Sequence, residues 1–120
     1  MTPSEIITAD ANQRGIDPQR VLGAIAQLIQ NNQGKLFNAG NSVLFVRLLS
    51  EDIGELHFFT EDSPIAISRY IKVFWNGLKK AGIKRVYGNA DNQEILQLIQ
   101  RAGADIQQPD LEGYNWMAEV

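Results

Sequence analysis

The side chains best placed to do chemistry lie in one apolar segment, Glu55–Thr60. His57 is the single histidine of the chain, and a histidine side chain could take a proton from an amine, directly or through water. Glu55 is a second possible base, which we expect beside His57 on the opposite face of the strand. The alternative is a strand histidine with an ordinary hydrogen bond, and both interpretations stay open.

Other polar side chains offer further possibilities. Tyr114 is either a general acid on the last strand or an aromatic side chain packed beside Trp116. Arg47 interrupts an apolar run, so it either binds an anion or faces solvent. Four cations surround the end of a predicted helix, where they either complement the helix dipole or form a phosphate patch: Lys79, Lys80, Lys84 and Arg85.

Composition excludes several kinds of site and partner. The chain has no cysteine, which removes disulfides, thiolate catalysis and thiolate metal sites, and one histidine is too few for a histidine-rich metal site. A net charge of −3 and a pI near 5.0 give no general attraction to nucleic acid, so we do not expect a nucleic-acid partner. No apolar run approaches the ~20 residues of a membrane span, and the start of the chain lacks signal-peptide features. We therefore expect a cytoplasmic protein without a membrane partner.

Cap signals and apolar spacing predict four helices. A short helix is expected over residues 3–13, and Asp17–Pro18 starts a second that continues toward Gly34. Ser63–Pro64 repeats the signal for a third helix, which closes at Gly82. Asp91 with Glu94 forms a capping box for the fourth, which ends at Gly103.

The remaining apolar runs predict strands. A hairpin that turns at residues 38–41 leads into strands over 43–49 and 55–60, a meander. Shorter strands are expected at 84–88, 104–106 and 113–120. The order α-α-β-β-β-α-β-α-β(-β) predicts an α/β (α+β) fold, with a mixed, mostly antiparallel sheet flanked by helices. We expect one domain over residues 1–120, with a helical part at 1–34 and a core at 35–120.

This order, together with the segment Asn89–Ala104, resembles the Gcn5-related N-acetyltransferase (GNAT) family. The family's second motif places an asparagine near a strand end, apolar residues along the next helix and a glycine at its close. The positions that match are Asn92, Ile95, Leu98, Ile99, Gly103 and Ala104. The resemblance covers about Leu36–Val120, and the family's first strand has no obvious counterpart before Asp17.

The resemblance implies an acetyl-CoA site at the turn before the third helix, with the pyrophosphate on backbone N–H groups. It implies these cofactor contacts: Phe59, Thr60, Ser63, Ile65, Ala66 and Asn92. The chain departs from the family's pattern here, because residues 60–66 contain no glycine and Pro64 lacks a donor. Glu61 and Asp62 would repel the pyrophosphate, and we expect them to complement the helix dipole instead. Ile99 occupies the position of the family's frequent proton-donating tyrosine.

These departures favour a GNAT-like domain that lacks acetyltransferase activity, requires no cofactor and acts by binding or assembly. Size and element order suggest an analogy with small GNAT-like virion or accessory proteins of tailed phages, which would place the protein in the virion. The alternative is an acetyl-CoA-dependent N-acyltransferase with His57 or Glu55 as base and Tyr114 as acid. A third, less favoured possibility is anion binding at residues 79–85. Core packing is the default role of Trp75, but it and Trp116 could instead mark a protein interface or self-association.

Overall fold

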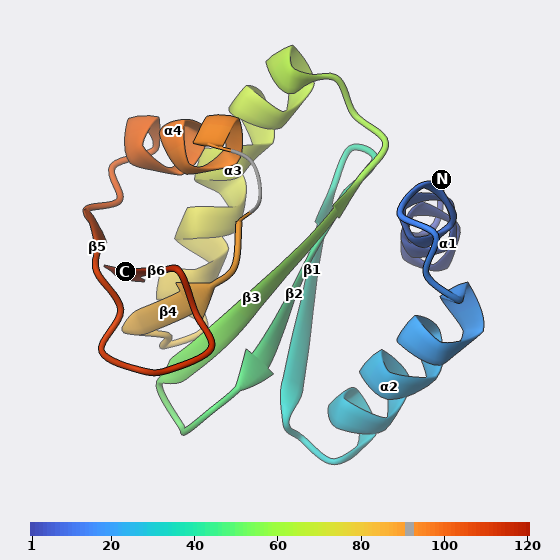
Figure 1. Cartoon of the computed structure of the whole chain (residues 1–120), viewed down its shortest axis with the longest axis horizontal. Coiled ribbons are helices and arrows are strands. Elements are labelled where there is room, and N and C mark those ends of the chain that lie inside the picture. The colour runs from blue at the N-terminus through green and yellow to red at the C-terminus, as the bar shows by residue number, and fades with distance from the viewer. Residues whose placement is uncertain (91–92) are drawn as a thin grey trace.

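The computed structural model describes residues 1–90 and 93–120, and it contains the elements that the sequence predicted, in the predicted order (Figure 1). The helices are α1 (Pro3–Gln13), α2 (Pro18–Gln30), α3 (Pro64–Lys80) and α4 (Gln93–Arg101). The strands are β1 (Gly34–Ala39), β2 (Ser42–Leu48), β3 (Ile53–Thr60), β4 (Arg85–Gly88), β5 (Ile106–Gln107) and β6 (Trp116–Glu119). The predicted α/β fold class is confirmed.

The described strands form one six-stranded sheet in the order β1-β2-β3-β4-β6-β5. Neighbouring strands in this sheet are antiparallel, except for β3 and β4, which are parallel. The parallel pairing joins only residues 53–55 to residues 85–87, whereas β3 stays paired with β2 as far as Thr60. The second half of β3 therefore has an edge that β4 does not cover, and the sheet opens between these two strands.

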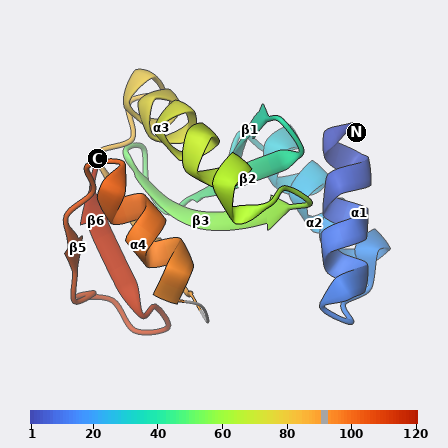
Figure 2. The ribbon, with the colours of Figure 1, turned by 90° about the horizontal axis from the view of Figure 1, so that it is seen from above.

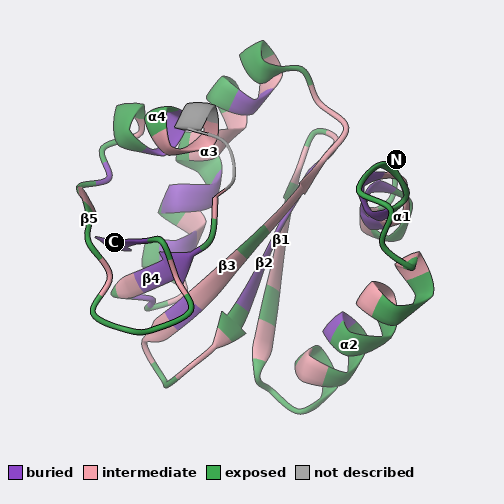
Figure 3. Ribbon diagram, in the orientation of Figure 1, coloured by how far each residue is buried: buried purple, intermediate pink, exposed green. Residues whose placement is uncertain are grey.

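Helices cover both faces of the sheet (Figures 1 and 2). Helices α1 and α2 pack on one face of the β1–β3 meander, with Ile6, Ile7 and Ile25 against Val43 and Phe45. Helices α3 and α4 cover the other face, and Figure 3 shows buried residues on α1, β2, α3 and β4. Strand β2 serves both cores because its side chains alternate between the two faces.

The predicted helix starts are confirmed at the level of atoms. The Asp17 side chain accepts from the Gln19 N–H, and the Ser63 side chain accepts from the Ala66 N–H, each just before a proline at the start of a helix. The predicted capping box of Asp91 and Glu94 lies outside the residues whose side chains the structure describes.

Helix α2 ends earlier than predicted. Its last residue is Gln30, and Gly34 is the first residue of β1 rather than a helix stop. A Cβ at Gly34 would lie 2.7 Å from the Phe45 ring, so the absence of a side chain lets this strand approach the core. Strand β1 continues to Ala39, which leaves a turn of two residues, Gly40 and Asn41, where a longer turn was expected.

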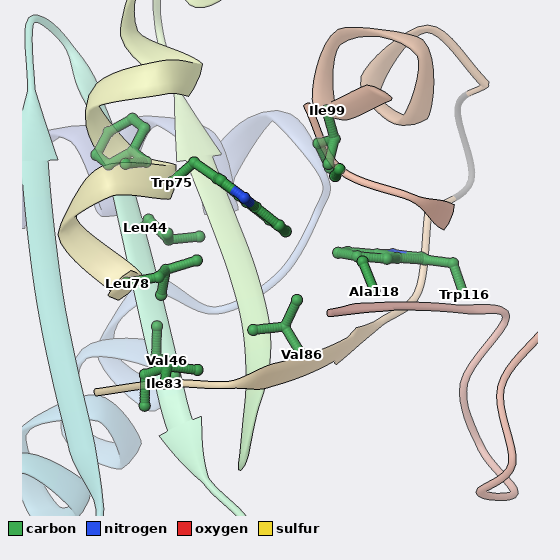
Figure 4. Close-up of a cluster of buried hydrophobic side chains, with 11 residues drawn as sticks. Leu44, Val46, Trp75, Leu78, Ile83, Val86, Ile99, Trp116 and Ala118 are labelled. Carbon is green, nitrogen blue, oxygen red and sulfur yellow. The ribbon is translucent and has the colours of Figure 1, made fainter. Parts of the chain in front are cut away.

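The prediction that the two tryptophans mark an interface is wrong, because both are buried. Trp75 is 6% exposed and Trp116 is 4% exposed. Figure 4 shows Trp75 extending from α3 toward Trp116 and Ile99. The Trp116 indole packs over Gly88, where an added Cβ would lie 2.5 Å from Nε1. Within the described residues, no helix is both long and apolar enough to span a membrane.

Candidate functional site at the opening between β3 and β4

An apolar cavity of about 470 Å³ lies where β3 and β4 separate. Both tryptophans of the chain line it, together with Phe58, Phe74 and Ile99. Its polar lining residues come from three places in the fold: Arg14 after α1, His57 and Thr60 on β3, and Asn89 after β4. A volume in the range of ~300–1,000 Å³ with a mainly apolar wall is typical of a small-molecule site.

A second cavity, of about 240 Å³, adjoins the first. We call the two the apolar cavity and the polar pocket. Leu56, His57 and Asn89 line both of them. The rest of the polar pocket is lined by Glu55, Glu112, Gly113 and Tyr114. The two cavities therefore meet at the uncovered part of β3, with an apolar side and a polar side.

The structure brings the three predicted catalytic residues together in the polar pocket. His57 Nε2 lies 2.5 Å from Glu55 Oε1, and the Tyr114 hydroxyl donates to Glu55 Oε2. The expectation that Glu55 and His57 occupy opposite faces of the strand is wrong, because residues two apart on a strand share a face. The contact between Glu55 and Tyr114 spans 59 residues of sequence.

The electrostatics of this cluster favour an ionised glutamate and a protonated tyrosine. Burial alone would raise the pKa of Glu55, but the hydrogen bonds from Tyr114 and His57 and the nearby charges hold that pKa below its ordinary value. Burial, and then the hydrogen bond to Glu55, raise the pKa of Tyr114. A phenol that is a weaker acid than usual, and whose proton Glu55 already accepts, is poorly suited to the predicted role of general acid.

The basic residues singled out in the sequence have acidic neighbours or lie on the surface. Arg47 is exposed, with Nε 3.7 Å from Glu55 Oε1, so it faces solvent beside the pocket. Lys84 lies 4.0 Å from an Asp52 oxygen. Arg85 Nη2 lies 2.6 Å from a Glu119 oxygen, so two members of the predicted phosphate patch face carboxylates.

The turn predicted to hold a cofactor pyrophosphate has three successive backbone donors occupied from within the chain. The N–H of Thr60 donates to Asp10 Oδ2 at 3.0 Å, and that of Glu61 donates to the Asn41 carbonyl at 3.0 Å. The N–H of Asp62 donates to Thr60 Oγ1 at 2.9 Å. Three successive donors are therefore filled, and Pro64 has none.

The two acids of this turn accept hydrogen bonds from other parts of the chain, and the side chain that caps α3 is that of Ser63. Asp62 accepts from the N–H of Asn41 and from the Ser42 hydroxyl, at 2.9 and 2.6 Å. Glu61 Oε2 accepts from the Gln13 side chain at 3.4 Å. The helix has no acid in its first turn. These carboxylates instead tie the end of β3 to the β1–β2 turn and to α1.

The other residues predicted to contact a cofactor have different surroundings. The Phe59 side chain packs with the α1–α2 core. Ile65 is 71% exposed, Ser63 caps α3, and the Ala66 N–H donates to that cap. Asn92 lies outside the described residues. At residues 60–62, the three filled donors and the acids beside them do not fit an acetyl-CoA pyrophosphate.

Two residues that contact the uncovered edge of β3 escaped the sequence analysis, Asp10 and Arg14. Asp10 is 5% exposed and lies 2.8 Å from Arg14 Nε, while Arg14 Nη2 donates to the Phe58 carbonyl at 3.2 Å. On the edge of β3 that β4 leaves uncovered, Asp10 accepts from the N–H of Thr60 and Arg14 donates to the carbonyl of Phe58. An acid and a base four residues apart on a helix carry no signal that they will reach a strand 50 residues away.

No cluster of side chains suited to a metal ion is found among residues 1–90 and 93–120. No protein-family model matches the sequence. No curated protein matches it either.

Solved structures do match, over nearly the whole chain. An aminoglycoside 6'-acetyltransferase type Ii has a TM-score of 0.66 at 14% identity, covering 98% of this chain and 86% of its own. An acetyltransferase from Streptococcus agalactiae has a TM-score of 0.62 at 12% identity, covering 97% and 88%. The N-acetyltransferase PseH from Campylobacter jejuni, solved with acetyl coenzyme A, has a TM-score of 0.58 at 16% identity, covering 100% and 92%. The resemblance drawn from element order and residues 89–104 is confirmed at the level of fold: the chain has a GNAT-like fold.

Proposed function

We propose that this protein is a GNAT-like domain without acetyl-CoA-dependent acetyltransferase activity, and that it acts by binding or assembly. The observation that carries the proposal is that three backbone N–H donors at the end of β3 are already hydrogen-bonded. The N–H groups of Thr60, Glu61 and Asp62 all have acceptors within the chain.

Energetics support the same conclusion. A pyrophosphate at this turn would have to displace acceptors that already satisfy the donors, so it would gain little from them. It would also approach the carboxylates of Asp10, Glu61 and Asp62. One repulsion between unit charges at ~4 Å costs ~1 kcal/mol in water and ~4 kcal/mol near a protein surface. One such repulsion weakens binding by between about fivefold and nearly a thousandfold.

Calorimetric titration with acetyl-CoA and with CoA tests the proposal. We expect no heat of binding with either compound at millimolar concentration. Intrinsic tryptophan fluorescence of the same sample checks that the protein is folded, because both tryptophans are buried. A dissociation constant in the micromolar range would contradict the proposal.

A second possibility, an acetyl-CoA-dependent N-acyltransferase with divergent cofactor contacts, is favoured by one observation. His57, Glu55 and Tyr114 meet beside a cavity, as an acceptor amine and its base would require. Release of free CoA thiol from acetyl-CoA in the presence of a panel of amines tests it. Activity that is lost in His57→Ala and Glu55→Gln, and kept in the exposed-site control Glu51→Gln, would establish the enzyme in place of the binding protein.

For the binding role, we propose a protein partner or a second copy of this chain as the molecule that is bound. An interface would have to use surface other than the two buried tryptophans. Light scattering of the purified protein across micromolar concentrations tests self-association. The suggested phage role predicts the protein in purified virions, detectable by mass spectrometry.

A further inference from the structure

Two of the places where the sheet lacks a neighbouring strand are protected. Strand β5, at one end of the sheet, has only two residues, and so short an edge offers little for another chain to pair with. The half of β3 that β4 does not cover is hydrogen-bonded by the side chains of Asp10 and Arg14. The third place is β1, at the other end of the sheet (Figure 2).

The outer edge of β1 presents unpaired backbone groups. The Leu48 N–H donates to the Gln33 carbonyl, and in an antiparallel pair the backbone groups of every second residue face the partner strand. The residues of β1 whose groups face away from β2 are therefore Gly34, Leu36 and Asn38. Among residues 1–90 and 93–120, these N–H and C=O groups find no hydrogen-bond partner.

Strand β1 also lacks most of the features that keep an edge from pairing. Its six residues pair with β2 in unbroken register, so no bulge bends the edge, and none of them is proline. None of the six is buried, whereas five of the seven residues of β2 are. Lys35 is the one charged residue of the strand. The edge is therefore suited to accepting a further strand.

Helix α3 runs along β1 in the opposite direction. A Cβ at Gly40 would collide with the Tyr70 ring, and a Cβ at Gly77 would lie 3.1 Å from the Phe37 ring. The later part of the helix therefore lies over the earlier part of the strand. Lys80 follows Gly77 by one turn on the same side of the helix, which places it over the start of β1.

The charges along this side of the edge are positive. Lys35 faces the α3 side, because its neighbour Leu36 packs with the α1–α2 core and successive side chains alternate. Lys35 and Lys80 are exposed, and within the described part of the chain neither forms an ion pair. The 17 residues of α3 include no acid. An added strand is therefore favoured when it carries acids on this face.

The opposite face of the edge is apolar and uncharged. Leu36 is half-buried there, and the Leu28 Cβ at the end of α2 would lie 3.4 Å from a Cβ added to Gly34. The remaining side chain of β1 on this face is that of Asn38, which is exposed and neutral. Apolar side chains of an added strand would extend the surface that Leu36 begins.

A second copy of the chain fits this edge less well than an acidic segment does. Two β1 strands paired antiparallel about a two-fold axis would bring both α3 helices to the same face of the joined sheet. Lys35 and Lys80 would then approach their own symmetry mates, and like charges that oppose one another across strands are destabilising.

We propose that β1 binds an extended segment of a partner protein as an additional strand, with acidic side chains on the α3 side and apolar side chains on the α2 side. This inference rests on the proposed function, because it names the surface and the partner chemistry of the binding role. Main-chain hydrogen bonds supply affinity in this mode of recognition, and the alternating side chains supply specificity.

Amide hydrogen exchange of the protein alone tests the free edge. The N–H groups of Leu36 and Asn38 should exchange faster than those of Lys35 and Phe37, which face β2. Protection of Leu36 and Asn38 that grows with protein concentration would show a second copy on the edge, and it would overturn the assignment to a partner protein.

Three acetylated and amidated peptides serve as probes: EVEVEVE, KVKVKVK and EVEPEVE. The second reverses the charge of the first, and the third interrupts the strand with proline. Amide chemical shifts of the isotope-labelled protein follow binding. We expect EVEVEVE to shift the amides of β1, to slow exchange at Leu36 and Asn38, and to bind about tenfold more tightly than either other peptide. No shift in β1 at millimolar EVEVEVE would overturn the inference.

Lys35→Gln tests the charge. The residue is exposed, so the variant should fold, and we expect the preference for EVEVEVE over KVKVKVK to fall severalfold. Lys72→Gln is the matched control, because Lys72 is an exposed residue of α3 on a different side of the helix from Tyr70 and Gly77. An unchanged preference in Lys35→Gln, or equal falls in the two variants, would overturn the assignment of acidic side chains.

Asn38→Pro tests the backbone pairing. The N–H of this exposed residue faces away from β2, so proline keeps the β1–β2 hydrogen bonds while it removes an outward donor and obstructs an added strand. We expect no detectable binding of EVEVEVE to Asn38→Pro, and binding within about twofold of the parent protein in the control, Asn38→Ala. Equal binding by the two variants would overturn strand addition. Should Asn38→Pro fail to fold, unchanged exchange at Leu36 in the parent protein saturated with EVEVEVE would overturn it equally.

The failure of this inference is distinguishable from the failure of the proposed function. A protein that binds neither EVEVEVE nor acetyl-CoA contradicts the inference alone. Binding of acetyl-CoA by the same sample would overturn the proposed function, whatever the peptides do.

Discussion

At the scale of single residues, the Glu55 carboxylate organises the candidate site. It accepts from Tyr114 on one oxygen and contacts His57 through the other, and Arg47 lies beside it. These partners outweigh burial and keep the pKa of Glu55 below its ordinary value. A carboxylate held in this way is suited to orienting its neighbours and attracting a cation, whereas a general acid needs the opposite shift.

The depressed pKa of Glu55 makes stability depend on pH. The unfolded chain binds a proton at this glutamate near its ordinary value of ~4.3, above the folded value, so the free energy of unfolding falls as the pH drops through the interval between the two. In Tyr114→Phe one hydrogen bond to the carboxylate is lost and the pKa of Glu55 should rise. We therefore expect urea titrations between pH 7 and pH 3 to show a smaller loss of stability in the variant than in the parent protein.

Tyr70→Phe is the control for this comparison, because Tyr70 lies on α3 and does not line the polar pocket. At pH 7 the Tyr114→Phe protein should be less stable by ~1 kcal/mol, the net worth of an ordinary hydrogen bond. Parallel pH profiles for Tyr114→Phe and the parent protein would show that the hydrogen bond does not set the pKa of Glu55.

At the scale of elements, α1 is fastened to the open edge of β3 by the Asp10 carboxylate. In Asp10→Ala the Thr60 N–H loses its acceptor, and an unmade hydrogen bond at a buried position costs ~1–3 kcal/mol. Asp10→Asn keeps an oxygen for this N–H and should cost less. Amide hydrogen exchange at Thr60 checks the mechanism: we expect faster exchange in Asp10→Ala than in Asp10→Asn. Equal protection in the two variants would mean that Asp10 does not hold the strand edge.

The β1–β2 hairpin and α3 meet at Gly40. This glycine has φ +56°, and a Cβ added to it would collide with the Tyr70 ring. Gly15 has a similar φ of +71° with no atom nearby, so Gly15→Ala isolates the cost of the backbone, ~1–2 kcal/mol. Gly40→Ala should cost a further ~1–3 kcal/mol for overpacking. Urea unfolding of both variants measures the difference, and equal losses would show that the hairpin moves away from α3 without cost.

Local sequence signals predicted most of the elements, and they failed where distant residues meet. The pairs Asp17–Pro18 and Ser63–Pro64 mark helix starts because caps act within one turn of the backbone. No such signal links Asp10 to Thr60, because the contact depends on how α1 packs across the meander. In contrast, strand periodicity alone predicts that Glu55 and His57 share a face, so their assignment to opposite faces was an error of reasoning from the sequence.

At the scale of the whole molecule, two cores share one sheet. The core under α1 and α2 includes Val43 and Phe45, and the core under α3 and α4 includes Leu44 and Val46, so neighbouring residues of β2 point into different cores. Loss of either core would leave the other with an exposed sheet face. The two layers should therefore unfold together, in keeping with the predicted single domain.

Both tryptophans lie in the α3–α4 core, so their fluorescence reports that core, whereas far-UV circular dichroism reports all the helices. We expect the two signals to give the same urea midpoint, as a two-state transition requires.

Ile6→Ala removes a fully buried side chain from the other core and should cost ~2–5 kcal/mol. Because the cores are coupled through β2, this substitution should lower the fluorescence midpoint as much as the dichroism midpoint. Ile29→Ala, at an exposed position of α2, should shift neither signal measurably. A fluorescence midpoint that Ile6→Ala leaves unchanged would show that α1 and α2 unfold separately, and the predicted single domain would then be two cooperative units.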